Sequence, residues 1–179
     1  MIYLVRHGEA AAGWGTHPDP GLSNAGKAQA VAVATELAAL NLKNALTSPM
    51  QRCQETSHPF SKASGLVATI DPRVTEIPTP DGIEDRISWL RDLMSGTWQT
   101  TPQLVQNWRS TLIDTVLDLP DETVVFSHFI AINAIVGHLD GANDVTVFRP
   151  TYCSMTSLER SSSGIKLIER GSEATTKVL

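Results

Sequence analysis

The chain has 179 residues, 41% of them apolar and 18% charged, a composition that excludes disordered and fibrous proteins and predicts a single domain over residues 1–179. The net charge of −5 disfavours a general affinity for nucleic acid or anionic lipid, and no apolar run approaches the ~18 residues that a membrane span needs. Any anion that the protein binds must therefore be held by a local cluster of positive groups.

Short β-branched runs alternate with longer helical segments, which is the pattern of an α/β domain. The first strand is predicted over residues 2–5 and is followed by a helix over 23–42, with Ser23 as its N-cap. The second strand, at 44–48, leads into a helix over 48–64.

A third strand is predicted over 67–70, and helices follow at 82–95 and 101–119. The run TVVFS at 123–127 is a further strand, and it leads directly into a helix over 129–139. Each of these strands is thus followed by a helix or by a loop that leads to one.

The tail of the chain carries two strand-like runs, 154–159 and 165–169, which the residues RSSSG separate as a hairpin loop. A hairpin of this kind adds antiparallel strands to the edge of a sheet. The sequence therefore predicts a three-layer α/β/α sandwich whose central sheet is mostly parallel, with an antiparallel edge hairpin at the C-terminus.

The two cysteines, Cys53 and Cys153, form neither a disulfide framework nor a metal-binding spacing. Residues 1–5, MIYLV, belong to the first predicted strand and leave no room for a signal peptide. These observations predict a cytoplasmic location.

Polar side chains follow three of the predicted strands, at the point where each strand ends. The first strand delivers Arg6 and His7, and the strand at 123–127 delivers His128. The second strand delivers Ser48, the expected N-cap of the next helix, and Arg52 one turn into that helix. Because ligands of open α/β sheets bind beyond the carboxyl ends of the strands, we expect these side chains to converge on one pocket.

Two arginines and the N-termini of two helices provide the donors that an oxyanion such as phosphate requires. A histidine beside that anion supplies a neutral nitrogen nucleophile at physiological pH. Metal ligation is the chemical alternative, since zinc or manganese would accept His7, Glu9, Glu76 and His128. Arg6 and Arg52 would repel a divalent cation, and we therefore predict no metal site.

Five segments resemble those of the histidine phosphatase superfamily, also called phosphoglycerate mutase-like. They are LVRHGEA at the N-terminus, DPGLSNAGKAQA at 19–30, LTSPMQRCQET at 46–56, VTEI at 74–77 and VVFSHF at 124–129. The resemblance implies that His7 is the phosphorylated nucleophile and that Arg6, Arg52 and His128 hold the phosphoryl oxygens. Glu76 falls where the family places its proton donor.

The sequence also departs from the family pattern. Phe129 stands where members usually have a glycine after the second histidine, and AAAGWG replaces a segment in which mutase-like members carry an asparagine. The phosphate contact that this asparagine would make is either missing or supplied elsewhere, with Thr16 as the candidate, and Trp14, His17 and Phe129 are further candidate substrate contacts. The missing asparagine counts against sugar-phosphate mutase activity.

The sequence predicts a metal-independent phosphomonoester hydrolase that needs no cofactor and acts through a phosphohistidine on a small phosphorylated metabolite, or less readily on a phosphoprotein. Two alternatives remain open: a phosphoglycerate-mutase-type transferase and a non-catalytic phosphate-binding regulatory module. We expect a raised pKa for Glu76, and for His7 a pKa lowered by the two arginines. Glu9 either orients a neighbouring side chain or has no role in the site. The leaving group and the oligomeric state are not predicted.

Overall fold

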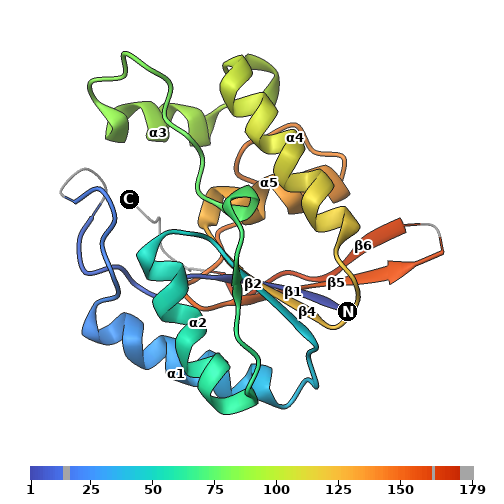
Figure 1. Ribbon diagram of the computed structural model, residues 1–179. Helices are drawn as coiled ribbons and strands as arrows, with labels where there is room; N and C mark the ends of the chain where they lie inside the picture. The colour runs from blue at the N-terminus through green and yellow to red at the C-terminus, as the bar shows by residue number, and fades with distance from the viewer. Residues whose placement is uncertain (14–16, 163, 174–179) are drawn as a thin grey trace.

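The computed structural model describes residues 1–13, 17–162 and 164–173, and its strands form one six-stranded sheet (Figure 1). The strand order is β3-β2-β4-β1-β5-β6. The strands are β1 (Ile2–Arg6), β2 (Asn44–Thr47), β3 (Thr69–Ile70), β4 (Thr123–Ser127), β5 (Met155–Ser161) and β6 (Gly164–Glu169).

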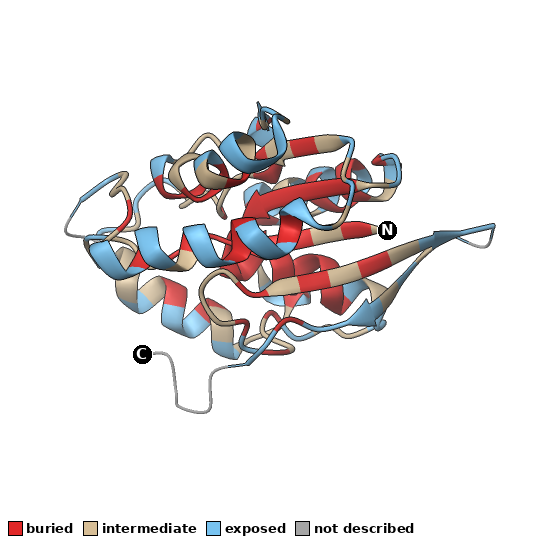
Figure 2. Cartoon of the chain, turned by 90° about the horizontal axis from the view of Figure 1, so that it is seen from below, coloured by how far each residue is buried: buried red, intermediate tan, exposed pale blue. Residues whose placement is uncertain are grey.

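Parallel pairing joins the four strands from β3 to β1, and the tail hairpin adds two antiparallel strands. β1 pairs with β4 and β2 pairs with β4 in parallel register, whereas β5 runs antiparallel to both β1 and β6. The predicted mostly parallel sheet with an antiparallel edge hairpin is confirmed. Figure 2 shows that the central strands are buried, while the far end of the hairpin extends into solvent.

Helices cover both faces of the sheet, as the three-layer prediction required (Figure 1). They are α1 (Asn24–Ala38), α2 (Gln51–Ser64), α3 (Arg86–Ser95), α4 (Gln103–Asp118) and α5 (Phe129–Leu139), with short 3-10 turns η1 (Pro72–Val74) and η2 (Trp98–Thr100). α1 and α2 pack on one face around a core that includes Val124 and Phe126 of β4. The helices α3, α4 and α5 pack on the other face around Leu4 and Val125.

Several boundaries differ from the predicted ones for local reasons. α1 ends at Ala38 rather than at residue 42, because the chain turns at Asn41, which has a φ of 49°. α3 begins four residues later than predicted because the Asp85 side chain caps it, accepting hydrogen bonds from the backbone N–H groups of Ile87 and Ser88.

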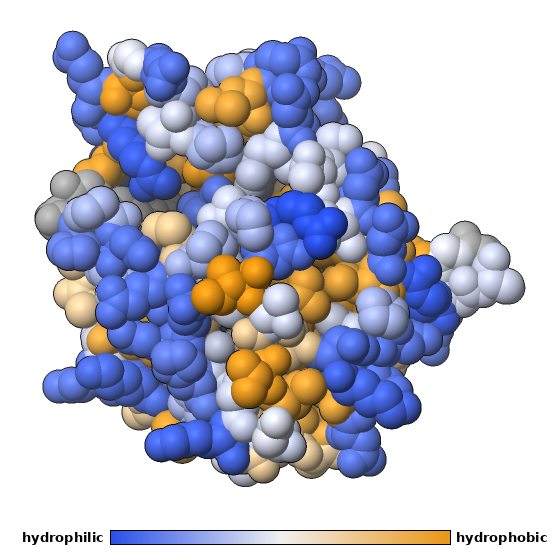
Figure 3. Space-filling model, in the orientation of Figure 1, coloured by the Kyte–Doolittle hydropathy of each residue, from blue (hydrophilic) through white to orange (hydrophobic). Residues whose placement is uncertain are grey.

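The third predicted strand contracts to the two residues of β3 at the edge of the sheet. The segment before it leaves Val67 76% exposed, and Ile70 within it is 53% exposed. Figure 3 shows apolar atoms gathered over this part of the surface, between α2 and η1. Within the described residues, no helix is long and apolar enough to cross a membrane.

Candidate active site

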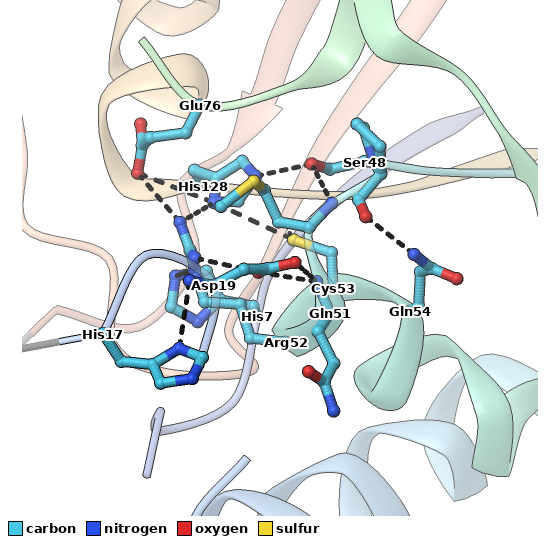
Figure 4. A network of polar contacts seen from close by, with 12 residues as sticks. His7, His17, Asp19, Ser48, Gln51, Arg52, Cys53, Gln54, Glu76 and His128 are labelled. Carbon is cyan, nitrogen blue, oxygen red and sulfur yellow. Dashed lines mark hydrogen bonds and ion pairs between the residues drawn. The ribbon is translucent and has the colours of Figure 1, made fainter. Parts of the chain in front are cut away.

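The carboxyl ends of β1, β2 and β4 lie side by side, and this arrangement brings the predicted site residues together (Figure 4). Arg6 is the last residue of β1 and is paired in register with Ser127, the last residue of β4. His7 and His128 therefore follow at the same edge, with their ring centroids 5.3 Å apart. Arg52 reaches the same point from the first turn of α2.

Glycine after the first histidine is explained by a close approach of two backbone segments. A Cβ atom on Gly8 would lie 2.7 Å from the carbonyl oxygen of Gly26 in α1. The N–H of Gly8 donates to the Thr56 hydroxyl of α2 at 3.0 Å. The loop that carries His7 is thus clamped by both helices on that face of the sheet, which fixes the position of the imidazole.

The hydrogen bonds of His7 determine which ring nitrogen carries the proton. Its Nδ1 lies 2.7 Å from the carbonyl oxygen of Gly8, which can only accept, so Nδ1–H is the donor. Its Nε2 accepts a hydrogen bond from Nε–H of Arg52 at 3.2 Å. The Nε2 lone pair of a neutral imidazole therefore points to the guanidinium group, where an anion would bind.

The same argument assigns the tautomer of His128, whose ring is fully buried. Nδ1 lies 3.1 Å from the NH2 nitrogen of Arg52, which can only donate, so the proton is on Nε2, 2.7 Å from the Ser48 hydroxyl. Ser48 is therefore a partner of His128. The predicted Ser48 N-cap of the helix is wrong, because α2 begins at Gln51 with Met50 at the cap position.

Glu76 reaches the site from the loop after η1, and its side chain is only 10% exposed. One carboxylate oxygen accepts from the N–H of Ile77 at 3.1 Å. The other lies 3.5 Å from Nδ1 of His128 and 3.7 Å from the NH2 nitrogen of Arg52. The loop residue predicted as a proton donor thus lies against His128, which follows β4, and Arg52 of α2.

Arg6 has a buried donor that no described residue satisfies. Its NH1 donates to the carbonyl oxygen of Pro150 at 2.8 Å, and its guanidinium stacks on the Tyr152 ring, 4.0 Å from the centroid. Its Nε is buried and has no partner within the described part of the chain. A buried N–H group without an acceptor is costly, and an anion in the site would satisfy it.

Burial dominates the electrostatics of the site. The pKa of His7 is well below its ordinary value, chiefly because the ring is desolvated and further because Arg52 and Arg6 lie nearby. The predicted direction is correct, but the two arginines are the smaller cause. The pKa of Glu76 is raised by burial, which outweighs the opposing effect of Arg52. Burial therefore favours the neutral form of both groups, an imidazole nucleophile and a carboxylic acid.

The site opens into a cavity of about 1020 Å³. Of the four candidate substrate contacts, His17 and Phe129 line this cavity, while Trp14 and Thr16 lie outside the described residues. Phe129 is 5% exposed, and its ring centroid is 5.2 Å from the guanidinium carbon of Arg6. The expectation that it forms a wall beside the anion site agrees with this position.

Glu9 is not among the residues that line the cavity. Its carboxylate accepts a hydrogen bond from the Ser23 hydroxyl at 2.6 Å, and that hydroxyl in turn caps α1 by accepting from the N–H of Gly26 at 3.0 Å. Glu9 therefore orients a neighbouring side chain, one of the two readings that the sequence left open.

Residues 1–13, 17–162 and 164–173 contain no group of three or more metal-ligating side chains arranged to hold an ion.

Sequence reasoning missed the contribution of the segment after α5. Tyr152 and Arg149 line the cavity, and the carbonyl of Pro150 orients Arg6. Asn133, buried in the largely apolar helix α5, holds this segment by accepting from the N–H groups of Val147 and Phe148 at 2.8 and 3.1 Å. A buried asparagine in an apolar helix was the one available signal that a loop is fastened there.

Comparisons with known proteins agree with this geometry. The sequence is 26% identical to a protein of Erwinia tasmaniensis named probable phosphoglycerate mutase GpmB, covering 91% of this chain and 86% of that protein. The fold resembles that of a phosphoserine phosphatase from Entamoeba histolytica, with a TM-score of 0.75, 20% identity and 96% of each chain covered. It also resembles a mycobacterial glucosyl-3-phosphoglycerate phosphatase, with a TM-score of 0.71, 22% identity and 98% of each chain covered.

The family model described as histidine phosphatase superfamily (branch 1) matches residues 2–172, nearly the whole chain. The matched region includes the strand-end histidines, both arginines and the loop glutamate of the site. The protein belongs to the histidine phosphatase superfamily.

Proposed function

We propose that the protein is a phosphomonoester hydrolase that works without a metal, through a phosphohistidine, on a small phosphorylated metabolite. The observation that carries this proposal is the contact of Nε2 of His7 with Nε–H of Arg52, beside a buried Glu76. The lone pair of His7, the positive charge of Arg52 and the carboxyl proton of Glu76 thus lie close enough together to act on one phosphoryl group. A cytoplasmic location belongs to the same proposal, and the free thiols of Cys53 and Cys153 support it.

The first chemical step forms the bond between Nε2 of His7 and phosphorus and breaks the bond from phosphorus to the leaving oxygen. Arg52 exchanges its hydrogen bond with His7 for one to a phosphoryl oxygen, and the unpartnered Nε–H of Arg6 donates to another. These donors stabilise the charge of the transferring group. His128 positions Arg52 through the hydrogen bond between its Nδ1 and the NH2 group of Arg52. A direct contact between His128 and the phosphate stays a prediction.

Glu76 has two successive tasks in this mechanism. In the first step it gives its proton to the leaving oxygen, which departs as an alcohol. In the second step the resulting carboxylate accepts a proton from water, the water oxygen attacks the phosphorus of phosphohistidine, and the bond between phosphorus and Nε2 of His7 breaks. Inorganic phosphate leaves, and both His7 and Glu76 return to their neutral forms.

A phosphoryl transferase is the second candidate function, because relatives such as the Erwinia protein carry the name phosphoglycerate mutase. The phosphatase names of the two similar structures favour hydrolysis. A mutase must retain its intermediate while the phosphoryl group returns to another oxygen of the same molecule. The two functions therefore differ in whether water reaches the phosphohistidine before the acceptor does.

The test is phosphate release from a panel of alkyl and aryl phosphates by chelator-treated protein, together with acid-labile phosphate on the protein in quenched samples. Hydrolysis that persists after chelation is the expected result. Loss of activity that zinc restores would contradict the proposal in favour of a metal mechanism. Positional transfer without phosphate release would identify a mutase, and phosphate binding without turnover would identify a regulatory module.

Glu76→Gln is expected to slow the hydrolysis of alkyl phosphates by about 10²-fold or more, because general acid catalysis contributes at least that factor when the leaving group is poor. Nitrophenyl phosphate, whose leaving oxygen needs little protonation, should lose much less. Steady-state kcat/KM on both substrates measures the difference. The raised pKa of Glu76 adds a second signature, since activity on alkyl phosphates falls as the pH rises through that pKa. Glutamine does not titrate, so the alkaline decline should disappear.

The matched control for this substitution is Glu84→Gln, which removes an exposed carboxylate from the segment that follows Glu76. Glu84 does not line the cavity, and its variant should behave as the unmodified protein. Equal losses on alkyl and aryl phosphates for Glu76→Gln would show that the carboxyl group positions Arg52 and His128 and donates no proton.

A further inference from the structure

The cavity carries far more positive charge than one phosphate group requires. Among the described residues, its lining includes five arginines, Arg6, Arg52, Arg86, Arg91 and Arg149, and a single carboxylate, that of Glu76. The chain as a whole has a net charge of −5, so this concentration is local. Because Arg6 and Arg52 suffice for the transferring phosphoryl group, three guanidinium groups have no task in the mechanism above.

These three arginines also have no carboxylate partner within 4 Å in the described part of the chain. The side chain of Arg86 donates to the Thr79 hydroxyl at 2.7 Å. The backbone N–H of Arg149, but not its guanidinium, contacts the Glu173 carboxylate at 3.1 Å. Arg91 and Arg149 are exposed and line the cavity, which places them at its solvent-accessible side. Grouped guanidinium groups without counter-charges create a positive potential that attracts an anion.

A second polar group in the same lining also lacks a partner. The Thr146 hydroxyl is buried and makes no hydrogen bond within the described residues. Thr146 lies three positions before Arg149 in the sequence, and both residues line the cavity. Apolar side chains complete the wall, among them Ile87 and Met94 of α3. The cavity beyond the phosphate centre is therefore an apolar space with cationic and hydroxyl donors, large enough at about 1020 Å³ for a molecule well above the size of phosphate.

We infer that the leaving group of the substrate carries a second anionic group, a carboxylate or another phosphate, which Arg91 and Arg149 bind while an apolar part of the molecule contacts Ile87 and Met94. This inference rests on the proposed function, since it assigns the leaving group of that reaction. It excludes neutral sugar-like leaving groups as preferred substrates, because they would leave both guanidinium groups unpaired.

The experiment compares three aryl phosphates that differ in the group at the end of a short alkyl chain on the ring: a carboxylate, its neutral methyl ester and a second phosphate. The expected kcat/KM of each charged substrate is about tenfold or more above that of the ester, the factor that one charge-assisted hydrogen bond of ordinary strength provides. The two charged substrates distinguish a carboxylate from a phosphate as the natural second group.

The double variant Arg91→Gln, Arg149→Gln should reduce this preference to near one, because glutamine keeps the polar chain and removes the charge. Arg86 stays unchanged in this variant, since its charge acts on the pKa of Glu76. Lys62→Gln is the control, as it removes one exposed positive charge from the last turn of α2, away from the cavity. It should keep the full preference.

The outcomes separate the inference from the proposed function. Hydrolysis of all three substrates at equal efficiency, or a preference that survives in the double variant, would overturn the inference and leave the hydrolase proposal intact. If no substrate is hydrolysed, the hydrolase proposal fails, and calorimetric binding of the matching phosphonates still tests the subsite. Tighter binding of the charged phosphonates that the double variant loses would support it, and equal binding would overturn it.

Discussion

His7→Ala is expected to reduce phosphate release by about 10⁴-fold or more, because without a nucleophile the covalent route is closed and only substrate binding remains. The fold should persist. The backbone N–H of His7 donates to the carbonyl of Ser127 at 3.0 Å whatever the side chain. Within the described residues, the ring makes hydrogen bonds only with Gly8 and Arg52. Phosphate release and thermal unfolding, measured on the same preparation, check both expectations.

A parallel measurement distinguishes a lost nucleophile from a lost binding site. Binding of inorganic phosphate to His7→Ala should survive, since the donors of Arg6 and Arg52 remain, and acid-labile phosphate on the protein should disappear. A variant that keeps a tenth of the activity would show that the nucleophile is misassigned. His128 would then be the next histidine to examine, although its ring is fully buried and does not line the cavity.

The residues at the strand ends were predictable because parallel strands bring their carboxyl ends to one edge of a sheet. His7 and His128 each follow a buried strand directly, so their convergence needs only the pairing of β1 with β4. Arg52 is one helical turn from a strand end, and the same reasoning reaches it. Glu76 lies in a loop, where no periodicity places a side chain, and only the family resemblance indicated it.

The remainder of the site depends on tertiary contacts that no local pattern encodes. Arg91 enters the cavity because of the way α3 packs, and Tyr152 enters because the segment after α5 folds back over the sheet. Ser48 shows the opposite case. Its position suited a helix cap, but a buried histidine competes for the same hydroxyl, and the helix begins three residues later at Gln51.

Arg52→Ala is expected to lower kcat/KM by about 10³-fold or more, which is the range for single arginines in phosphoryl transfer. Arg52 lies at the centre of the site. Its guanidinium contacts His7, His128 and Glu76 together. Its removal takes away a charge-assisted donor to the phosphoryl group and the group that orients both histidines. Kinetics on nitrophenyl phosphate measure the loss, and Lys62→Ala, an exposed residue of the same helix, is the control.

The pH profile and the variant Arg52→Lys distinguish the effect of the positive charge of Arg52 from the effect of its planar guanidinium group. Arg52 helps to hold the pKa of His7 below its ordinary value, so its removal raises that pKa, and the decline of activity on the acid side should move to higher pH. Lysine keeps the positive charge and loses the planar fork that contacts several groups at once. Arg52→Lys should therefore keep the acid limb near its original position while kcat/KM falls by about 10-fold to 10²-fold, less than for alanine.

An acid limb that stays in place for Arg52→Ala would show that burial alone sets the protonation of His7. Equal rates for the lysine variant and the unmodified protein would show that the charge of Arg52, and not the directed hydrogen bonds of its fork, carries the catalytic effect.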